Sequence, residues 1–122
     1  MFSVFQAWAV LFPLHEGWKA INIVDELCTI GRSNANSCTI CEAEAGTQLG
    51  KISKVHFALQ KTSEGILLAD RSTNGTFLNG EKVGYVTLGV KHGDLISLTH
   101  PSQNQFIFLR TEPYNYLEMY DL

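Results

Sequence analysis

Residues 70–80 read DRSTNGTFLNG, a polar stretch that lies between two apolar runs of the chain. It holds two Asn-Gly pairs, and Asn and Gly are common in turns because they tolerate the backbone angles that turns require. It also holds an arginine, a serine and two threonines, whose side chains donate hydrogen bonds. Two interpretations follow: a plain hairpin turn, or a loop whose side chains face a ligand.

On both sides of this stretch the chain consists of short β-rich runs separated by turn residues. No long window shows the three-and-four spacing of apolar residues that a helix produces, so we expect no helix longer than about one turn. Many short strands at regular spacing are typical of a β-sandwich or barrel. The sequence therefore predicts an all-β fold with strands near residues 7–12, 19–24, 27–31, 38–41, 55–60, 66–70, 76–79, 82–88, 95–100 and 105–110.

Several runs alternate between apolar and polar residues. Phe57 and Leu59 point to one side of their run, and Phe106 and Phe108 share one side of theirs. Alternation of this kind is typical of strands with one face in the core. We therefore expect these four side chains to be buried.

Length and charge limit the function classes. The 122 residues suit one domain, and 9 Lys and Arg against 12 Asp and Glu give no sign of the basic face of a nucleic-acid binder. No apolar run reaches the roughly 18 residues of a membrane span. The three cysteines are an odd number, which favours a reducing intracellular compartment over a disulfide framework.

Catalytic and metal-binding patterns are weak, and we expect no cofactor. Cys38 and Cys41 form a CxxC pair, but CTIC reads as a β-strand that would place the two thiols on opposite faces. Ser53 and His56 have no nucleophile elbow around them and no evident third member of a triad. The sequence predicts a binding module rather than an enzyme, with no metal site.

Three turn segments combine donors with strand ends: residues 31–33, 51–57 and 71–76. Loops at one end of a sandwich cluster in space even when they are far apart in sequence. Two cations, two hydroxyls and one amide would then meet, a set that suits a phosphate dianion. The alternative is ordinary solvated turn chemistry. The residues concerned are Arg32, Ser53, Lys54, Thr73 and Asn74.

Three motifs occur in a fixed order: Gly31-Arg32, then the SKVH of residues 53–56, then the NGT of residues 74–76. In this order and at this spacing they resemble the forkhead-associated (FHA) domain, over roughly residues 7–112. The resemblance implies a β-sandwich of about eleven short strands that binds phosphothreonine through loops at one end. Residues 113–122 would then be a tail or linker toward a kinase domain that is absent from this chain.

The resemblance also implies roles for single residues. Arg32 and Ser53 would hold the phosphate with help from Lys54, and Thr73 would line the same site. Asn74 would hold the peptide backbone beside the phosphothreonine.

Other residues would support the site or read the peptide. Gly31 would let the Arg32 loop turn tightly, and His56 would support the loop that presents Ser53, with Gly75 also structural. Lys51, two residues before Ser53, could favour an acidic residue three positions past the phosphothreonine.

Within the family, residues 51–57 and 93–113 look most like the FHA domain of a checkpoint kinase of the DNA-damage response. This implies a nuclear regulatory module whose partner is a phosphothreonine protein, including a Thr-Gln segment of its own parent kinase and a phosphorylation-dependent dimer. Two alternatives stay open: the FHA domain of another damage-response protein, such as a ubiquitin ligase or repair scaffold, and a sandwich that binds proteins independently of phosphate through a side face.

Overall fold

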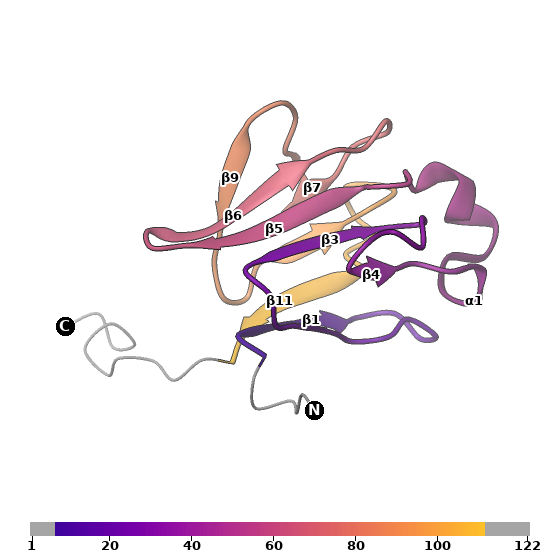
Figure 1. Ribbon diagram of the computed structural model, residues 1–122. Helices are drawn as coiled ribbons and strands as arrows, with labels where there is room; N and C mark the ends of the chain where they lie inside the picture. The colour runs from indigo at the N-terminus through magenta and orange to yellow at the C-terminus, as the bar shows by residue number, and fades with distance from the viewer. Residues whose placement is uncertain (1–6, 112–122) are drawn as a thin grey trace.

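Two β-sheets face each other across one apolar core in the computed structural model, which describes residues 7–111 (Figure 1). One sheet has the order β2-β1-β11-β10-β7-β8, and the other has the order β4-β3-β5-β6-β9. All neighbouring strands are antiparallel except β3 and β4. The predicted β-sandwich of about eleven strands is confirmed. The strands are β1 (Ala9–Pro13), β2 (Ile21–Ile23), β3 (Leu27–Gly31), β4 (Cys38–Thr39), β5 (Phe57–Thr62), β6 (Gly65–Asp70), β7 (Phe77–Leu78), β8 (Glu81–Lys82), β9 (Thr87–Val90), β10 (Leu95–Ser97) and β11 (Phe106–Arg110).

The core is formed by the apolar side chains that point inward from the alternating strands. Phe57 and Leu59 of β5 and Phe106 and Phe108 of β11 are all fully buried, as the alternation predicted. Burying a side chain of this size contributes about 1.5–3 kcal/mol. Trp18 packs edge-on against Phe106 with ring centroids 5.6 Å apart. The core therefore fixes which face of each strand is left for solvent or ligands.

The second Asn-Gly pair of the opening stretch is a hairpin turn. Asn79 and Gly80 both have positive φ, 52° and 86°, and they connect β7 to β8 where Leu78 pairs with Glu81. A two-residue hairpin loop of this kind favours Asn-Gly because the mirror-image turn needs positive φ at both positions. The plain-turn interpretation is thus correct for this half of the stretch.

Three details of the predicted elements are wrong. The run 82–88 is not one strand, because Gly84 with φ 73° separates β8 from β9. The run 38–41 is not a strand throughout: β4 ends at Thr39, and the Cys41 N–H donates to the Glu44 carboxylate (3.3 Å) at the start of α1 (Glu42–Ala45). A 3₁₀ helix, η2 (Gly46–Lys51), follows and is longer than the single turn expected. Helices this short carry no readable periodicity.

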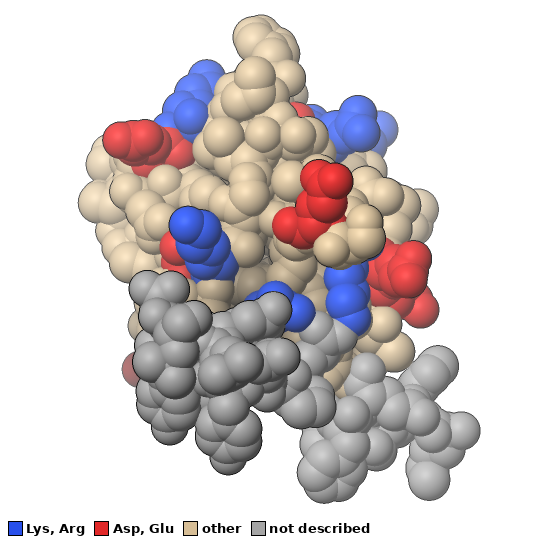
Figure 2. All heavy atoms as spheres, turned by 90° about the vertical axis from the view of Figure 1, so that its left-hand side faces the viewer, with Lys and Arg blue, Asp and Glu red and all other residues tan. Residues whose placement is uncertain are grey.

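The segments around residues 31–33, 51–57 and 71–76 come together at one end of the sandwich, beyond the carboxyl end of β3 and the start of β5 (Figure 1). The Arg32 N–H donates to the Ser53 carbonyl and the Ser33 N–H to the Lys54 carbonyl, both at 3.1 Å. Figure 2 shows the opposite end, where basic and acidic side chains are interspersed. The loops expected to meet therefore do meet.

Gly31 is needed at this end for a reason other than the tight turn expected. Its φ is not positive, and a Cβ built on it would lie 2.2 Å from the Lys54 carbonyl oxygen and 2.9 Å from the His56 nitrogen. Only a residue without a side chain lets β3 pass this close to the segment before β5.

We expect Gly31→Ala to destabilise the fold by about 1–3 kcal/mol, because the backbone must move to accommodate the methyl group. Urea unfolding would measure the change. Gly89→Ala is the matched control, since a Cβ there meets nothing closer than 4.0 Å and the residue also lies in a strand. Equal stability of the two variants would contradict this account of Gly31.

Candidate ligand-binding site

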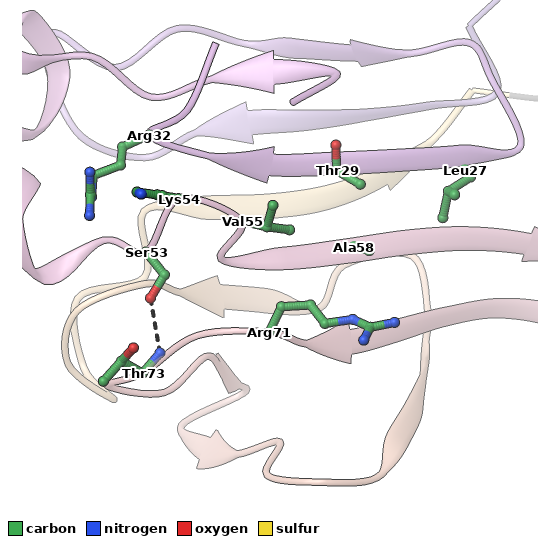
Figure 3. A pocket seen from close by; sticks show the side chains of 9 residues that line it. All are labelled: Leu27, Thr29, Arg32, Ser53, Lys54, Val55, Ala58, Arg71 and Thr73. Carbon is green, nitrogen blue, oxygen red and sulfur yellow. Dashed lines mark hydrogen bonds between the residues drawn. The ribbon is translucent and has the colours of Figure 1, made fainter. Parts of the chain in front are cut away.

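A groove with a volume of about 670 Å³ opens at the loop end and runs onto the five-stranded sheet (Figure 3). Four of the residues selected from the sequence line it: Arg32, Ser53, Lys54 and Thr73. Lys51 and Asn74 lie beside the groove rather than in its lining. Among residues 7–111 no group of three or more His, Cys, Asp or Glu side chains could hold a metal ion. The complete lining is Leu27, Thr29, Arg32, Ser53, Lys54, Val55, Ala58, Arg71 and Thr73.

Arg32 is held in place from one side. Its Nε–H donates to the Ile52 carbonyl at 2.8 Å, and Ile52 is anchored in the core with 1% of its surface exposed. The side chain itself is exposed, and its guanidinium lies at the same end of the groove as the Lys54 ammonium (Figure 3). The terminal amino groups of Arg32 are therefore positioned to donate two parallel bonds to an anion.

Ser53 is oriented by the facing loop. Its Oγ accepts the Thr73 N–H at 2.9 Å, which brings residues 71–76 against residues 51–57 (Figure 3). A hydroxyl has one donor and two acceptor sites, so the O–H proton of Ser53 remains for a ligand. On the outer side of the same contact, the Asn74 amide donates to the Lys51 carbonyl at 3.2 Å.

His56 joins the two loops from inside the protein. The ring is fully buried, its Nδ1 lies 3.1 Å from the Ser53 nitrogen, and its Nε2 lies 2.9 Å from the Gly75 carbonyl oxygen. A backbone N–H only donates and a carbonyl only accepts, so Nδ1 is the acceptor and Nε2 carries the proton. The His56 ring thus connects the backbone of Ser53 to the backbone of Gly75.

Burial lowers the pKa of His56, and its hydrogen bond to the Gly75 carbonyl opposes this only in part. Neutral His56 is also the form that the structure requires, because a proton on Nδ1 would remove the acceptor for the Ser53 N–H. The protonation of one buried ring is therefore linked to the position of Ser53.

Asp70 at the end of β6 fixes the loop of residues 71–76 by hydrogen bonds, a role that was not predicted from the sequence. Its carboxylate accepts the Ser72 N–H (2.9 Å), the Ser72 hydroxyl (2.6 Å), the Thr76 hydroxyl (2.9 Å) and the Thr76 N–H (3.1 Å). Burial alone would raise the pKa of Asp70, but these bonds from Ser72 and Thr76 outweigh it and lower the pKa. The carboxylate is thus occupied and does not line the groove. The signal available in the sequence was an aspartate with a serine two residues later, the pattern of an Asx turn.

Gly75 completes the loop. Its φ is 112°, and its N–H donates to the Ser72 hydroxyl at 2.8 Å. A side chain at this φ would be strained and would approach the Phe77 ring at 3.1 Å. The first Asn-Gly pair, residues 74–75, therefore shapes the groove end, whereas the second is an ordinary hairpin turn.

None of the three cysteines lines this groove. All three are free, and burial raises the pKa of Cys28 to about 11 and also raises the pKa of Cys38. A raised pKa keeps a thiol protonated and unreactive near neutral pH. No helix among the described residues is long and apolar enough to cross a membrane.

The free energy of unfolding should fall as the pH drops below about 6.5, the ordinary pKa of histidine. In that range His56 of the unfolded chain binds a proton, whereas the buried His56 of the folded chain does not. The free energy of unfolding therefore rises with pH and reaches its full value above the pKa of histidine in the unfolded chain. Urea unfolding between pH 7.5 and 5 would show it. The exposed-histidine control His100→Gln should keep the pH dependence. His56→Gln should be less stable and show a smaller dependence; an undiminished dependence would contradict the assignment.

The model of the FHA domain family matches residues 28–99. The ovarian-specific serine/threonine-protein kinase Lok of Drosophila melanogaster is 32% identical over 100 residues, which cover 77% of this chain and 21% of the kinase. The chain thus spans about a fifth of the length of the curated relative it matches.

Solved structures share the fold. The N-terminal FHA domain of Rad53p from Saccharomyces cerevisiae, in complex with a phosphothreonine peptide, has a TM-score of 0.71 at 19% identity, covering 93% of this chain and 98% of that one. EmbR of Mycobacterium tuberculosis, in complex with a low affinity phosphopeptide, has a TM-score of 0.69 at 21% identity, covering 89% of this chain and 26% of that one.

The family match covers more than half of the 122 residues and includes all three motifs noted in the sequence. FHA domains belong to the modules that recognise phosphorylated motifs, and they bind rather than catalyse. The chain belongs to the FHA domain family.

Proposed function

We propose that this domain binds phosphothreonine in an extended peptide, with the phosphate at the loop end of the groove. The observation that carries the proposal is the convergence of Arg32, Ser53, Lys54 and Thr73 on one end of a groove whose lining holds no carboxylate. A phosphate with about −1.5 to −2 charges and three acceptor oxygens matches two cations and two hydroxyls. The complexes of related FHA folds with phosphopeptides support the same choice of ligand.

Each side chain has a distinct part. Arg32, steadied by its bond to Ile52, grips two phosphate oxygens, and Lys54 adds a point charge. Ser53 donates its remaining O–H while its Oγ keeps the Thr73 N–H. The Thr73 hydroxyl lines the same end. A small apolar pocket for the methyl group would select phosphothreonine over phosphoserine.

Asn74 sets the direction of the peptide. Its amide nitrogen already donates to the Lys51 carbonyl, which leaves its Oδ1 to accept a backbone N–H of the peptide. Lys51 is exposed next to this contact and reads the third residue past the phosphothreonine. The peptide would thus cross the loop end with its carboxyl-terminal side toward Lys51.

The parent protein is proposed to be a checkpoint kinase of the DNA-damage response, similar to checkpoint kinase 2, acting in the nucleus. The match to the Lok kinase and the fold shared with Rad53p support this. The domain would span residues 7–112, and the tail or linker of residues 113–122 lies outside the described residues. In the parent kinase, a phosphorylated Thr-Gln segment of a second molecule would dock here and bring two kinase domains together.

Arg32→Ala should weaken phosphothreonine binding about tenfold to a hundredfold, because hydrogen bonds to charged groups contribute about 1.5–3 kcal/mol. Fluorescence anisotropy would measure it with one Thr-Gln peptide in phosphothreonine, phosphoserine and unmodified forms. The control Lys91→Ala removes an exposed cation on the turn before β10, outside the groove, and should bind like the unsubstituted chain.

Only the phosphothreonine form should bind tightly. Binding of the unmodified peptide with equal affinity would favour a phosphate-independent interaction module instead. Retention of phosphopeptide binding by Arg32→Ala would remove the loop end as the phosphate site.

Lys51→Glu should reverse the preference at the third residue past the phosphothreonine. The unsubstituted chain should favour aspartate over lysine there by about threefold to fivefold, the size expected of one exposed ion pair. An oriented phosphopeptide library screened against both proteins would show the reversal. Identical profiles from the two proteins would exclude Lys51 as a reader of the peptide.

A further inference from the structure

The groove is longer than a phosphate needs. Its volume of about 670 Å³ lies in the range of about 300–1,000 Å³ that holds drug-sized ligands, whereas a phosphate group has only five heavy atoms. Arg32, Ser53, Lys54 and Thr73 occupy one end, and the remainder extends over β3 and β5 (Figure 3). This remainder is the flank groove, lined by Leu27, Thr29, Val55, Ala58 and Arg71.

The strand register explains why the surface is hollow there. Thr29 of β3 lies opposite Ala58 of β5, and Ala58 lies opposite Ala69 of β6. These residues alternate with core residues, so they form a row of small side chains on the outer face of the sheet. The next row, which contains Leu27 and Gln60, is bulkier. Small side chains beside larger ones leave a shallow trough over β3 and β5.

The rim of the flank groove is apolar and open to solvent. Leu27 is 53% exposed and Val55 is 38% exposed, and both line the same concavity, whereas Ala58 at its floor is only 8% exposed. Single exposed aliphatic residues are normal on a protein surface, but here two of them border one hollow. An aliphatic side chain of a ligand placed there would contact both Leu27 and Val55.

One cation borders this part of the groove. Arg71 is exposed, and its guanidinium extends away from Ser53 and Thr73 and so away from the phosphate end (Figure 3). Its backbone N–H donates to the His56 carbonyl at 2.9 Å, which fixes where the side chain begins. Within residues 7–111 its side chain has no hydrogen bond or ion pair, so the guanidinium is available to a carboxylate of a ligand.

We propose that the flank groove is a second subsite for the same peptide, taking an aliphatic side chain next to an acidic residue, two to four positions before the phosphothreonine. The proposal rests on the proposed function. A strand rises about 3.3 Å per residue, so Thr29 and Leu27 lie about 7 and 13 Å from Gly31 along β3. An extended peptide covers the same lengths in two and four residues.

The direction follows from Lys51. Lys51 and Val55 lie on either side of Ser53 along the chain, and only Val55 lines the groove. If Lys51 reads residues after the phosphothreonine, the flank groove faces the residues before it. The ligand class is therefore a phosphothreonine peptide with an acidic and aliphatic amino-terminal flank.

Fluorescence anisotropy with two phosphothreonine peptides tests the subsite. The peptides share their carboxyl-terminal half and carry either Leu and Asp or only Ala at positions two to four before the phosphothreonine. The unsubstituted chain should bind the Leu-Asp peptide about tenfold more tightly, from one covered aliphatic side chain and one ion pair. Leu27→Gln and Arg71→Glu should each reduce this ratio to about threefold or less.

Matched controls carry the same changes elsewhere. Val86→Gln alters an exposed aliphatic residue outside the groove, and Lys91→Glu reverses a distant charge; both should keep the tenfold ratio. If the unsubstituted chain binds both peptides with equal affinity and Arg32→Ala binds neither, the proposed function stands and the subsite is overturned. A ratio that persists in Leu27→Gln and Arg71→Glu would also overturn it. Failure of both peptides to bind would overturn the proposed function and the subsite together.

Discussion

The loop end of this domain depends on one buried imidazole. His56 accepts a hydrogen bond from the backbone of Ser53 and donates one to the backbone of Gly75, so a single side chain spans the two loops that form the groove end. A buried polar group is costly unless it makes a hydrogen bond, and both ring nitrogens of His56 make one. The satisfied ring therefore specifies one relative position of the two loops.

Asp70 is the second residue that fixes the loop end. The Asp70 carboxylate collects four hydrogen bonds from Ser72 and Thr76, and it lies at the end of β6, where the strand already has a fixed place in the sandwich. The polar groups on the inner side of the loops are already paired with His56 and Asp70. The side-chain donors of Arg32, Ser53 and Lys54 therefore face outward, toward the groove. The core thus positions the buried polar contacts, and these contacts position the side chains of the site.

The sequence predicted the strands with alternating apolar residues and the meeting of the three loops, because both depend on local periodicity and on the general geometry of sandwiches. It did not predict the role of Asp70 or the reason for Gly31, since these depend on which atoms approach across the fold: the Lys54 carbonyl leaves no room for a side chain at Gly31. It also missed the flank groove, because the small residues Thr29 and Ala58 come from two strands and lie side by side only once the register is known.

The bond between the Thr73 N–H and the Ser53 Oγ, and that between Asn74 and the Lys51 carbonyl, are made entirely within the domain. The loss of conformational entropy in these loops thus belongs to folding and not to complex formation. A peptide would meet loops that are already bonded to each other, so binding should need little rearrangement of these loops. Differences in affinity between competing peptides would then lie chiefly in how long each stays bound.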